Sequence, residues 1–136
     1  MLGKVIVLVS AFVCITGCGD RERYREAVLA QLKQEKDIND YKIEHNKMAD
    51  CILAETSKNM KGVLDFDPIR VSEYQKYTKL LNLKTTPDPQ KTLKELREEF
   101  GGAQDLANAN ANFSESLFEC MSALVTDASE SEQKKN

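Results

Sequence analysis

The sequence predicts an all-α protein, a small and mostly antiparallel bundle of four or five helices. Two observations support this prediction. The 136-residue chain has six glycines and three prolines, and such sparse punctuation suits helices joined by short loops. Apolar residues between Leu106 and Leu124 recur with the period of an α-helix. A chain of this length supports one domain with a modest core.

The N-terminus has the organisation of an export signal. Lys4 is followed by an apolar run, Val5 to Val13, and then by small residues. The run up to Gly17 is shorter than the roughly 20 apolar residues that a transmembrane helix needs. We therefore expect residues 1–17 to be a cleaved signal peptide, residues 18–125 to be the helical bundle domain, and residues 126–136 to be a disordered polar tail.

The signal ends in Ile15-Thr16-Gly17-Cys18, which resembles the lipobox of bacterial lipoproteins. The resemblance implies that Cys18 receives a diacylglyceryl group, that the chain is cut before it, and that acyl chains then anchor the protein in the membrane. Two acyl chains give stable anchoring, whereas one gives marginal binding. By resemblance to Gram-negative sorting, Gly19 favours the periplasmic leaflet of the outer membrane over the inner membrane. The alternative is an apolar N-terminal helix with a buried cysteine.

Residues 20–60 contain no glycine or proline. Apolar residues recur as a stripe at helical spacing in the second half of this segment. The stripe comprises Ile38, Tyr41, His45, Met48 and Ile52. Because residues 33–40 are nearly all polar, the segment is either one long helix or two helices that meet near Asn39 or Asp40. We favour two helices, or one with a bend.

Two shorter helices are expected after Gly62. Asp67 before Pro68 is typical of a turn or a helix start, and Ser72 with Gln75 matches a capping box. This helix runs to about Leu83, and its apolar side is Tyr74, Tyr77 and Leu81.

Asp88 and Pro89 then predict the start of the next helix, which carries Leu93, Leu96 and Phe100 and ends at Gly101-Gly102. The final helix has its seam along one line, formed by Leu106, Asn110, Phe113, Leu117, Cys120 and Leu124. Asn110 on this seam is a candidate buried amide that sets helix register or binds a partner.

Two cysteines remain once Cys14 is discarded and Cys18 is lipidated. Because exported proteins meet an oxidising compartment, a Cys51–Cys120 disulfide is the natural inference. The alternative is a pair of buried free thiols, since Cys51 lies off the centre of its own apolar stripe.

The remaining candidate site residues favour structural interpretations. His45 is the one histidine, and a zinc site needs three or four ligands, so a core or boundary histidine is expected. Asp65 and Asp67 are expected in a turn and a cap rather than at calcium. Arg21 and its neighbours Arg23 and Arg25 either meet lipid headgroups or form a solvated helix start. Tyr41, Tyr74 and Tyr77 form either a contact patch or part of the core.

These observations predict a non-catalytic helical module, either binding or structural, that faces the periplasm and meets an envelope protein partner. The sequence has no serine–histidine motif or phosphate loop, so neither an enzyme nor a cofactor is expected. A net charge of −3 without a basic block argues against nucleic acid. The alternatives are an immunity, inhibitor or entry-exclusion lipoprotein, and a carrier of a small apolar ligand lined by Met48, Met60 and Met121.

Overall fold

A computed structural model describes residues 16–133, which form six α-helices and one short 3-10 helix, η1, with no strand in this range. The elements in chain order are α1 (Thr16–Leu32), α2 (Lys36–Asp40), α3 (His45–Lys58), α4 (Pro68–Leu81), η1 (Leu83–Thr85), α5 (Pro89–Phe100) and α6 (Ala103–Gln133). The all-α prediction is confirmed, although the chain has more helices than the four or five expected. The predicted signal peptide lies almost entirely outside the described residues.

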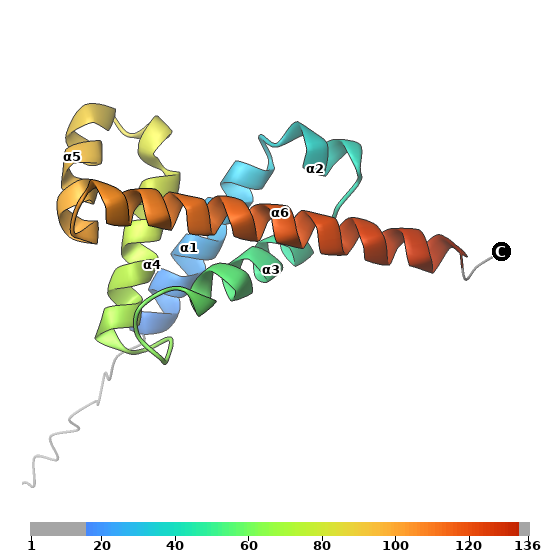
Figure 1. Ribbon diagram of the computed structural model, residues 1–136, viewed down its shortest axis with the longest axis horizontal. Coiled ribbons are helices and arrows are strands. Elements are labelled where there is room, and N and C mark those ends of the chain that lie inside the picture. Colours follow the sequence, from blue (N-terminus) through green and yellow to red (C-terminus); the bar gives the residue numbers. More distant parts are fainter. Residues whose placement is uncertain (1–15, 134–136) are drawn as a thin grey trace, which may run out of the picture.

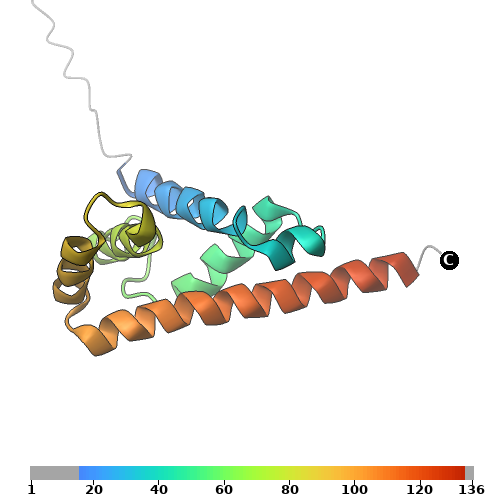
Figure 2. The ribbon, with the colours of Figure 1, turned by 90° about the horizontal axis from the view of Figure 1, so that it is seen from above.

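The long helix α6 spans the length of the molecule (Figure 1). It packs along α3, which runs in the opposite direction, and α1 packs against both α3 and α4. Helices α4 and α5 form a hairpin that stands across the N-terminal part of α6, so the arrangement is less uniformly antiparallel than predicted (Figure 2). Within residues 16–133, no helix is both long enough and apolar enough to cross a bilayer.

The predicted stripe from Ile38 to Ile52 does not lie on one helix. The chain turns twice, around the five-residue α2 and again before α3, and Lys42 in the second turn has a left-handed backbone with φ of 55°. Ile38 is buried, whereas Tyr41 is 62% exposed. Apart from Ile38, residues 33–40 are polar and offer no continuous apolar face, so the chain breaks there and α3 folds back against α1.

The helix ends follow local capping signals. The Asp67 carboxylate accepts a hydrogen bond from the Ile69 amide at 2.9 Å, with Pro68 in the first turn of α4. Ser72 therefore lies inside α4, and the predicted capping box is wrong because Asp67 has already capped the helix one turn earlier. Asp88 caps α5 at the Lys91 amide, and Gly101 ends it with φ of 105°, as predicted.

The centre of the core is aromatic. The ring of Tyr24 on α1 lies 6.0 Å from that of Tyr74 and 5.7 Å from that of Tyr77, measured between centroids. The Tyr77 ring in turn meets Phe100 at 5.8 Å. Tyr74 and Tyr77 are therefore core residues, and Tyr24, rather than Tyr41, is the third tyrosine of the cluster.

The buried face of α6 overlaps the predicted seam but is rotated from it. Leu106 and Cys120 are buried, and the other apolar residues of the seam, Phe113, Leu117 and Leu124, are partly buried against the core. Asn110 is exposed, whereas Asn112 and Ser116 are 8% and 4% exposed. The centre of the buried face is turned by about 60° from the centre of the predicted seam, taking 100° per residue. The small residues Ala109 and Ser116 are buried on this face, and the larger Leu117 packs partly buried at its edge.

The expected polar tail is partly wrong. Helix α6 continues through Gln133, so residues 126–133 are helical. The segment contains no glycine or proline to end the helix. The last three residues of the predicted tail lie outside the described range.

The three arginines of α1 are all engaged with carboxylates. Arg23 pairs with Asp20 at 2.9 Å, and Arg25 pairs with Asp50 of α3 at 2.6 Å. The hydrogen bond from Arg25 holds the pKa of the Asp50 carboxyl below its usual value. Arg21 lies 3.3 Å from Asp65 in the α3–α4 loop. The pairs of Arg21 and Arg25 connect α1 to the α3–α4 loop and to α3, whereas the Arg23–Asp20 pair lies within α1.

Candidate functional site

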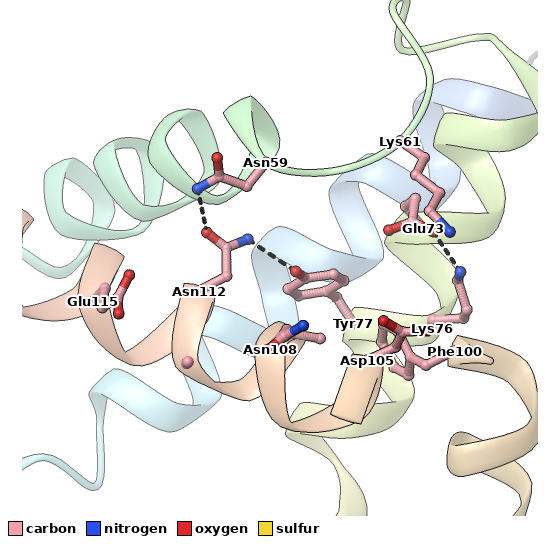
Figure 3. Close-up of a pocket in the computed structure, with 12 residues that line it drawn as sticks. Asn59, Lys61, Glu73, Lys76, Tyr77, Phe100, Asp105, Asn108, Asn112 and Glu115 are labelled. Carbon is pink, nitrogen blue, oxygen red and sulfur yellow. Dashed lines mark hydrogen bonds and ion pairs between the residues drawn. The ribbon is translucent and has the colours of Figure 1, made fainter. Parts of the chain in front are cut away.

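A polar recess of about 390 Å³ opens between α4 and α6, beside the ends of α3 and α5 (Figure 3). Helix α4 contributes Glu73, Lys76 and Tyr77, and α6 contributes Asn108, Asn112 and Glu115, among other residues. We call this feature the Asn112 recess. It exists because α4 stands across α6, which leaves room where the two helices diverge.

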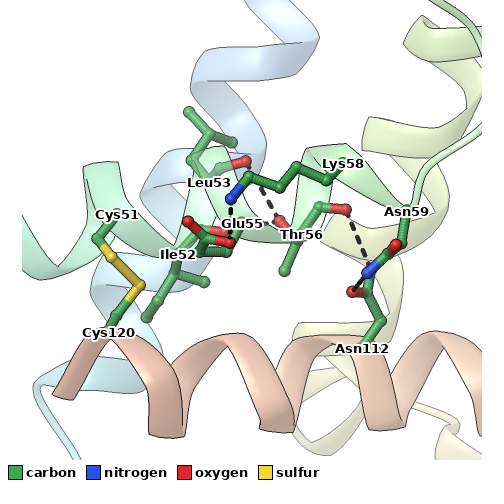
Figure 4. A network of polar contacts seen from close by, with 9 residues as sticks. All are labelled: Cys51, Ile52, Leu53, Glu55, Thr56, Lys58, Asn59, Asn112 and Cys120. Carbon is green, nitrogen blue, oxygen red and sulfur yellow. Dashed lines mark hydrogen bonds and ion pairs between the residues drawn. A yellow bond between two sulfur atoms is a disulfide. The ribbon is translucent and has the colours of Figure 1, made fainter. Parts of the chain in front are cut away.

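Asn112 uses both sides of its amide at the base of the recess. The nitrogen donates to the Tyr77 hydroxyl at 2.8 Å and to the Thr56 carbonyl at 3.1 Å. The oxygen accepts a hydrogen bond from the Asn59 side chain at 2.9 Å (Figure 4). One buried amide therefore joins α6 to α4 and to both the last turn and the C-terminal cap of α3.

The polar network continues into the core. The Thr56 hydroxyl accepts a hydrogen bond from the Tyr24 hydroxyl at 3.0 Å and donates to the Ile52 carbonyl at 2.8 Å. Burial raises the pKa of Tyr77, an effect that the hydrogen bond from Asn112 partly offsets. Burial likewise raises the pKa of Tyr24. Both hydroxyls therefore stay protonated at neutral pH and act as hydrogen-bonding groups rather than as bases.

The charges in the recess are of both signs. Lys76 forms an ion pair with Glu73, and its ammonium group lies 5.0 Å from the centre of the Phe100 ring. Both members of the pair are largely buried, so they are held in place. Lys61 and Glu115 at the edge are exposed. The recess therefore offers amide and charged groups to a polar ligand.

The other candidate residues from the sequence, His45, Asp65 and Asp67, do not form one site, because His45 lies at the opposite end of α3 from the two aspartates. His45 is half-buried at the start of α3, where its ring lies 3.1 Å from the Asn39 amide oxygen, so it is a boundary residue. Asp65 accepts a hydrogen bond from the Tyr74 hydroxyl at 2.7 Å, and Asp67 caps α4. Among residues 16–133, no three histidine, cysteine, aspartate or glutamate side chains are grouped to hold a metal. Met48 and Met60 are part of the packed core, and Met121 is partly buried against it.

Cys51 and Cys120 form the predicted disulfide between α3 and α6, with their Cα atoms 5.9 Å apart (Figure 4). The off-centre position of Cys51 on its own stripe places it toward α6. Asn59 follows Cys51 by eight residues, and Asn112 precedes Cys120 by eight. The disulfide and the Asn59–Asn112 hydrogen bond therefore require the same antiparallel register, at points about 12 Å apart along each helix.

Two residues of this network were missed in the sequence. Asn112 lies in the segment LANANANF, where three asparagines alternate with alanines between Leu106 and Phe113. The signal that identifies it is the recurrence of small residues at Ala109, Asn112, Ser116 and Cys120, spaced by three and four. Tyr24 lies in a highly charged segment, so its burial is not evident from the sequence. The side chain of Cys18, the predicted lipidation site, lies outside the described part of the structure.

Comparison of the chain with known protein families, characterised proteins and solved structures finds no match.

Replacing Asn112 with alanine is expected to destabilise the protein by about 2–4 kcal/mol, because Thr56, Tyr77 and Asn59 each lose a partner in or near the core. Asn110→Ala is the matched control. Asn110 is exposed on the same helix, so its replacement is expected to be neutral or to stabilise by a few tenths of a kcal/mol. Urea unfolding at neutral pH measures both. Equal effects of the two substitutions would refute the assigned face of α6.

Removing the disulfide is expected to cost about 4 kcal/mol, the chain-entropy estimate for its 69-residue separation. We expect the double variant Cys51→Ala/Cys120→Ala to remain helical, because the Asn112 contacts still define the register. Urea unfolding with and without reductant provides the test. Reductant should lower the stability of the wild type and leave the double variant unchanged; insensitivity of the wild type would contradict the pairing.

Proposed function

We propose that this protein is a lipid-anchored, non-catalytic binding module of the bacterial cell envelope, held at the membrane by acyl chains on Cys18 and facing the periplasm. The observation that carries the proposal is the pairing of Cys51 with Cys120. Disulfides persist in oxidising compartments and are rare in the cytosol. The signal sequence that ends at Cys18 supplies a route to such a compartment. The N-terminal motif and the core therefore support the same location independently.

The anchor gives the binding role a physical basis. A tether confines the bundle to the membrane surface, which raises its effective concentration toward a partner in the same layer. Gly19 after the anchor supports the periplasmic leaflet of the outer membrane, by the sorting rule noted above. Weak contacts at a small surface then give a higher occupancy than they would between molecules free in solution.

The Asn112 recess is the binding surface that we assign to this module. Asn59, Tyr77 and Asn112 are held in place by the core network, so these side chains lose little conformational entropy when a ligand binds. Charges of both signs beside exposed amides suit a polar segment of a partner protein. Glu115 at the edge is the natural residue to test, because it is exposed and its replacement leaves the Asn112 contacts intact.

The location is tested by the intact mass of the protein from a membrane fraction, alkylated without prior reduction. We expect a chain that begins at Cys18 and carries a diacylglyceryl group, with or without a third acyl chain, and no alkylation at Cys51 or Cys120. Cys18→Ser is the control and should lack the lipid mass. An unprocessed wild-type chain with alkylated thiols would contradict both the anchor and the compartment.

The binding surface is tested by affinity capture from an envelope extract. We expect the wild type to retain a specific envelope protein, and Glu115→Lys to weaken retention by about tenfold, which corresponds to about 1.4 kcal/mol at the edge of an interface. The matched control is Glu98→Lys, an exposed charge on the face of α5 opposite Phe100. Equal retention by both variants would exclude the recess, and no retained protein would argue against a binding role.

A further inference from the structure

The loop between α3 and α4 and the first turn of α4 together expose four large apolar side chains close together in the sequence. Val63 is 87% exposed, Leu64 52%, Phe66 73% and Ile69 56%. We call residues 63–69 the apolar loop. Single exposed apolar residues are common on protein surfaces, but a cluster of this kind marks an interaction site.

The backbone of the apolar loop is held in this conformation. The buried Arg70 guanidinium donates to the Ser57 carbonyl and to the Gly62 carbonyl, so it ties the end of α3 to the loop. Gly62 has φ of 84°, and a Cβ atom at this position would lie 2.6 Å from the backbone nitrogen of Arg70. Asp67 accepts hydrogen bonds from the amides of Val63 and Ile69. The apolar side chains are therefore presented to the outside by a fixed framework.

The two acidic residues of the apolar loop are engaged in contacts within the protein. Asp67 serves as the cap of α4, and Asp65 accepts from the Tyr74 hydroxyl while it pairs with Arg21. Arg23 is paired with Asp20 on α1. The nearby charges thus largely neutralise one another, so the chemistry that the loop adds to the surface is apolar rather than ionic.

The apolar loop lies beside the start of α1, next to the point where the described chain begins (Figure 1). The ion pair between Arg21 and Asp65 at 3.3 Å joins the two. Position 18 is three residues before Arg21 on the same helix, which is about 4.5 Å along the helix axis. An acyl anchor at position 18 therefore brings the apolar loop to the membrane surface.

We propose that the apolar loop is a second membrane contact, in which Val63, Leu64, Phe66 and Ile69 enter the apolar edge of the bilayer beside the acyl chains on Cys18. This inference rests on the proposed function, because the anchor supplies the proximity. Apolar side chains bind a membrane in proportion to the area that they bury, and the paired charges make the contact independent of anionic lipid. Two contacts, the anchor and the loop, fix the orientation of the bundle, which a single flexible anchor does not.

The absence of tryptophan from the chain provides a direct test. Phe66→Trp introduces a single fluorophore into the apolar loop, and Val63→Trp is a second variant at the most exposed position of the loop. The matched control is Phe118→Trp on α6, which replaces a similarly exposed phenylalanine, 67% exposed, close to α2 at the other end of α1. Each lipidated protein, its acyl mass verified, is reconstituted in vesicles of zwitterionic lipid, with and without bromine on the acyl chains.

We expect the emission of both loop variants to shift to shorter wavelength in vesicles and to lose intensity with brominated lipid, while Phe118→Trp keeps its solvent-exposed emission. Emission without a shift in both loop variants would overturn the second contact and leave the anchor intact. A shift without quenching would also overturn it, because a second copy of the chain rather than lipid would then cover the loop. Absence of acyl mass would overturn the anchor and this inference together.

Discussion

The structure depends on the register of α6 against α3. The Cys51–Cys120 disulfide and the hydrogen bond between Asn59 and Asn112 fix this register at two points, with the same offset on both helices. One contact is covalent, and the other is a buried amide whose misplacement leaves several polar groups unpaired. A slip of α6 by one turn would break both. Helix α1 packs against α3 and α5 packs against α6, while α4 packs against α1 and α5.

The buried amide also defines the shape of the surface. Asn112 reaches from α6 to Tyr77 on α4, so the same residue that sets the register also joins the crossing helices at the recess. Lys76 and Glu73 then occupy the space between those helices as an ion pair. The candidate binding surface is therefore a consequence of how the core is built, and the groups that line it are positioned before any partner arrives.

The proposed anchor and the two proposed contact surfaces differ in their chemistry and in their place on the molecule. The start of α1 and the apolar loop share one region, where Arg21 meets Asp65 and apolar side chains face outward. The recess presents amides and mixed charges instead. An arrangement of this kind suits a protein that uses its apolar surface at a membrane and its polar surface for a partner. The two surfaces are assigned from different residues and are tested separately.

Local signals in the sequence determined the helical class, the starts of α4 and α5 at Asp67-Pro68 and Asp88-Pro89, and the pairing of Cys51 with Cys120. These features depend on neighbouring residues or on simple elimination, so they are readable without the fold. Tertiary packing alone decided that Asn112 rather than Asn110 is buried, because which face of α6 is covered depends on how closely α3 and α4 approach it. The same holds for the recess, and for the position of the apolar loop beside α1, since both arise where segments distant in the sequence meet.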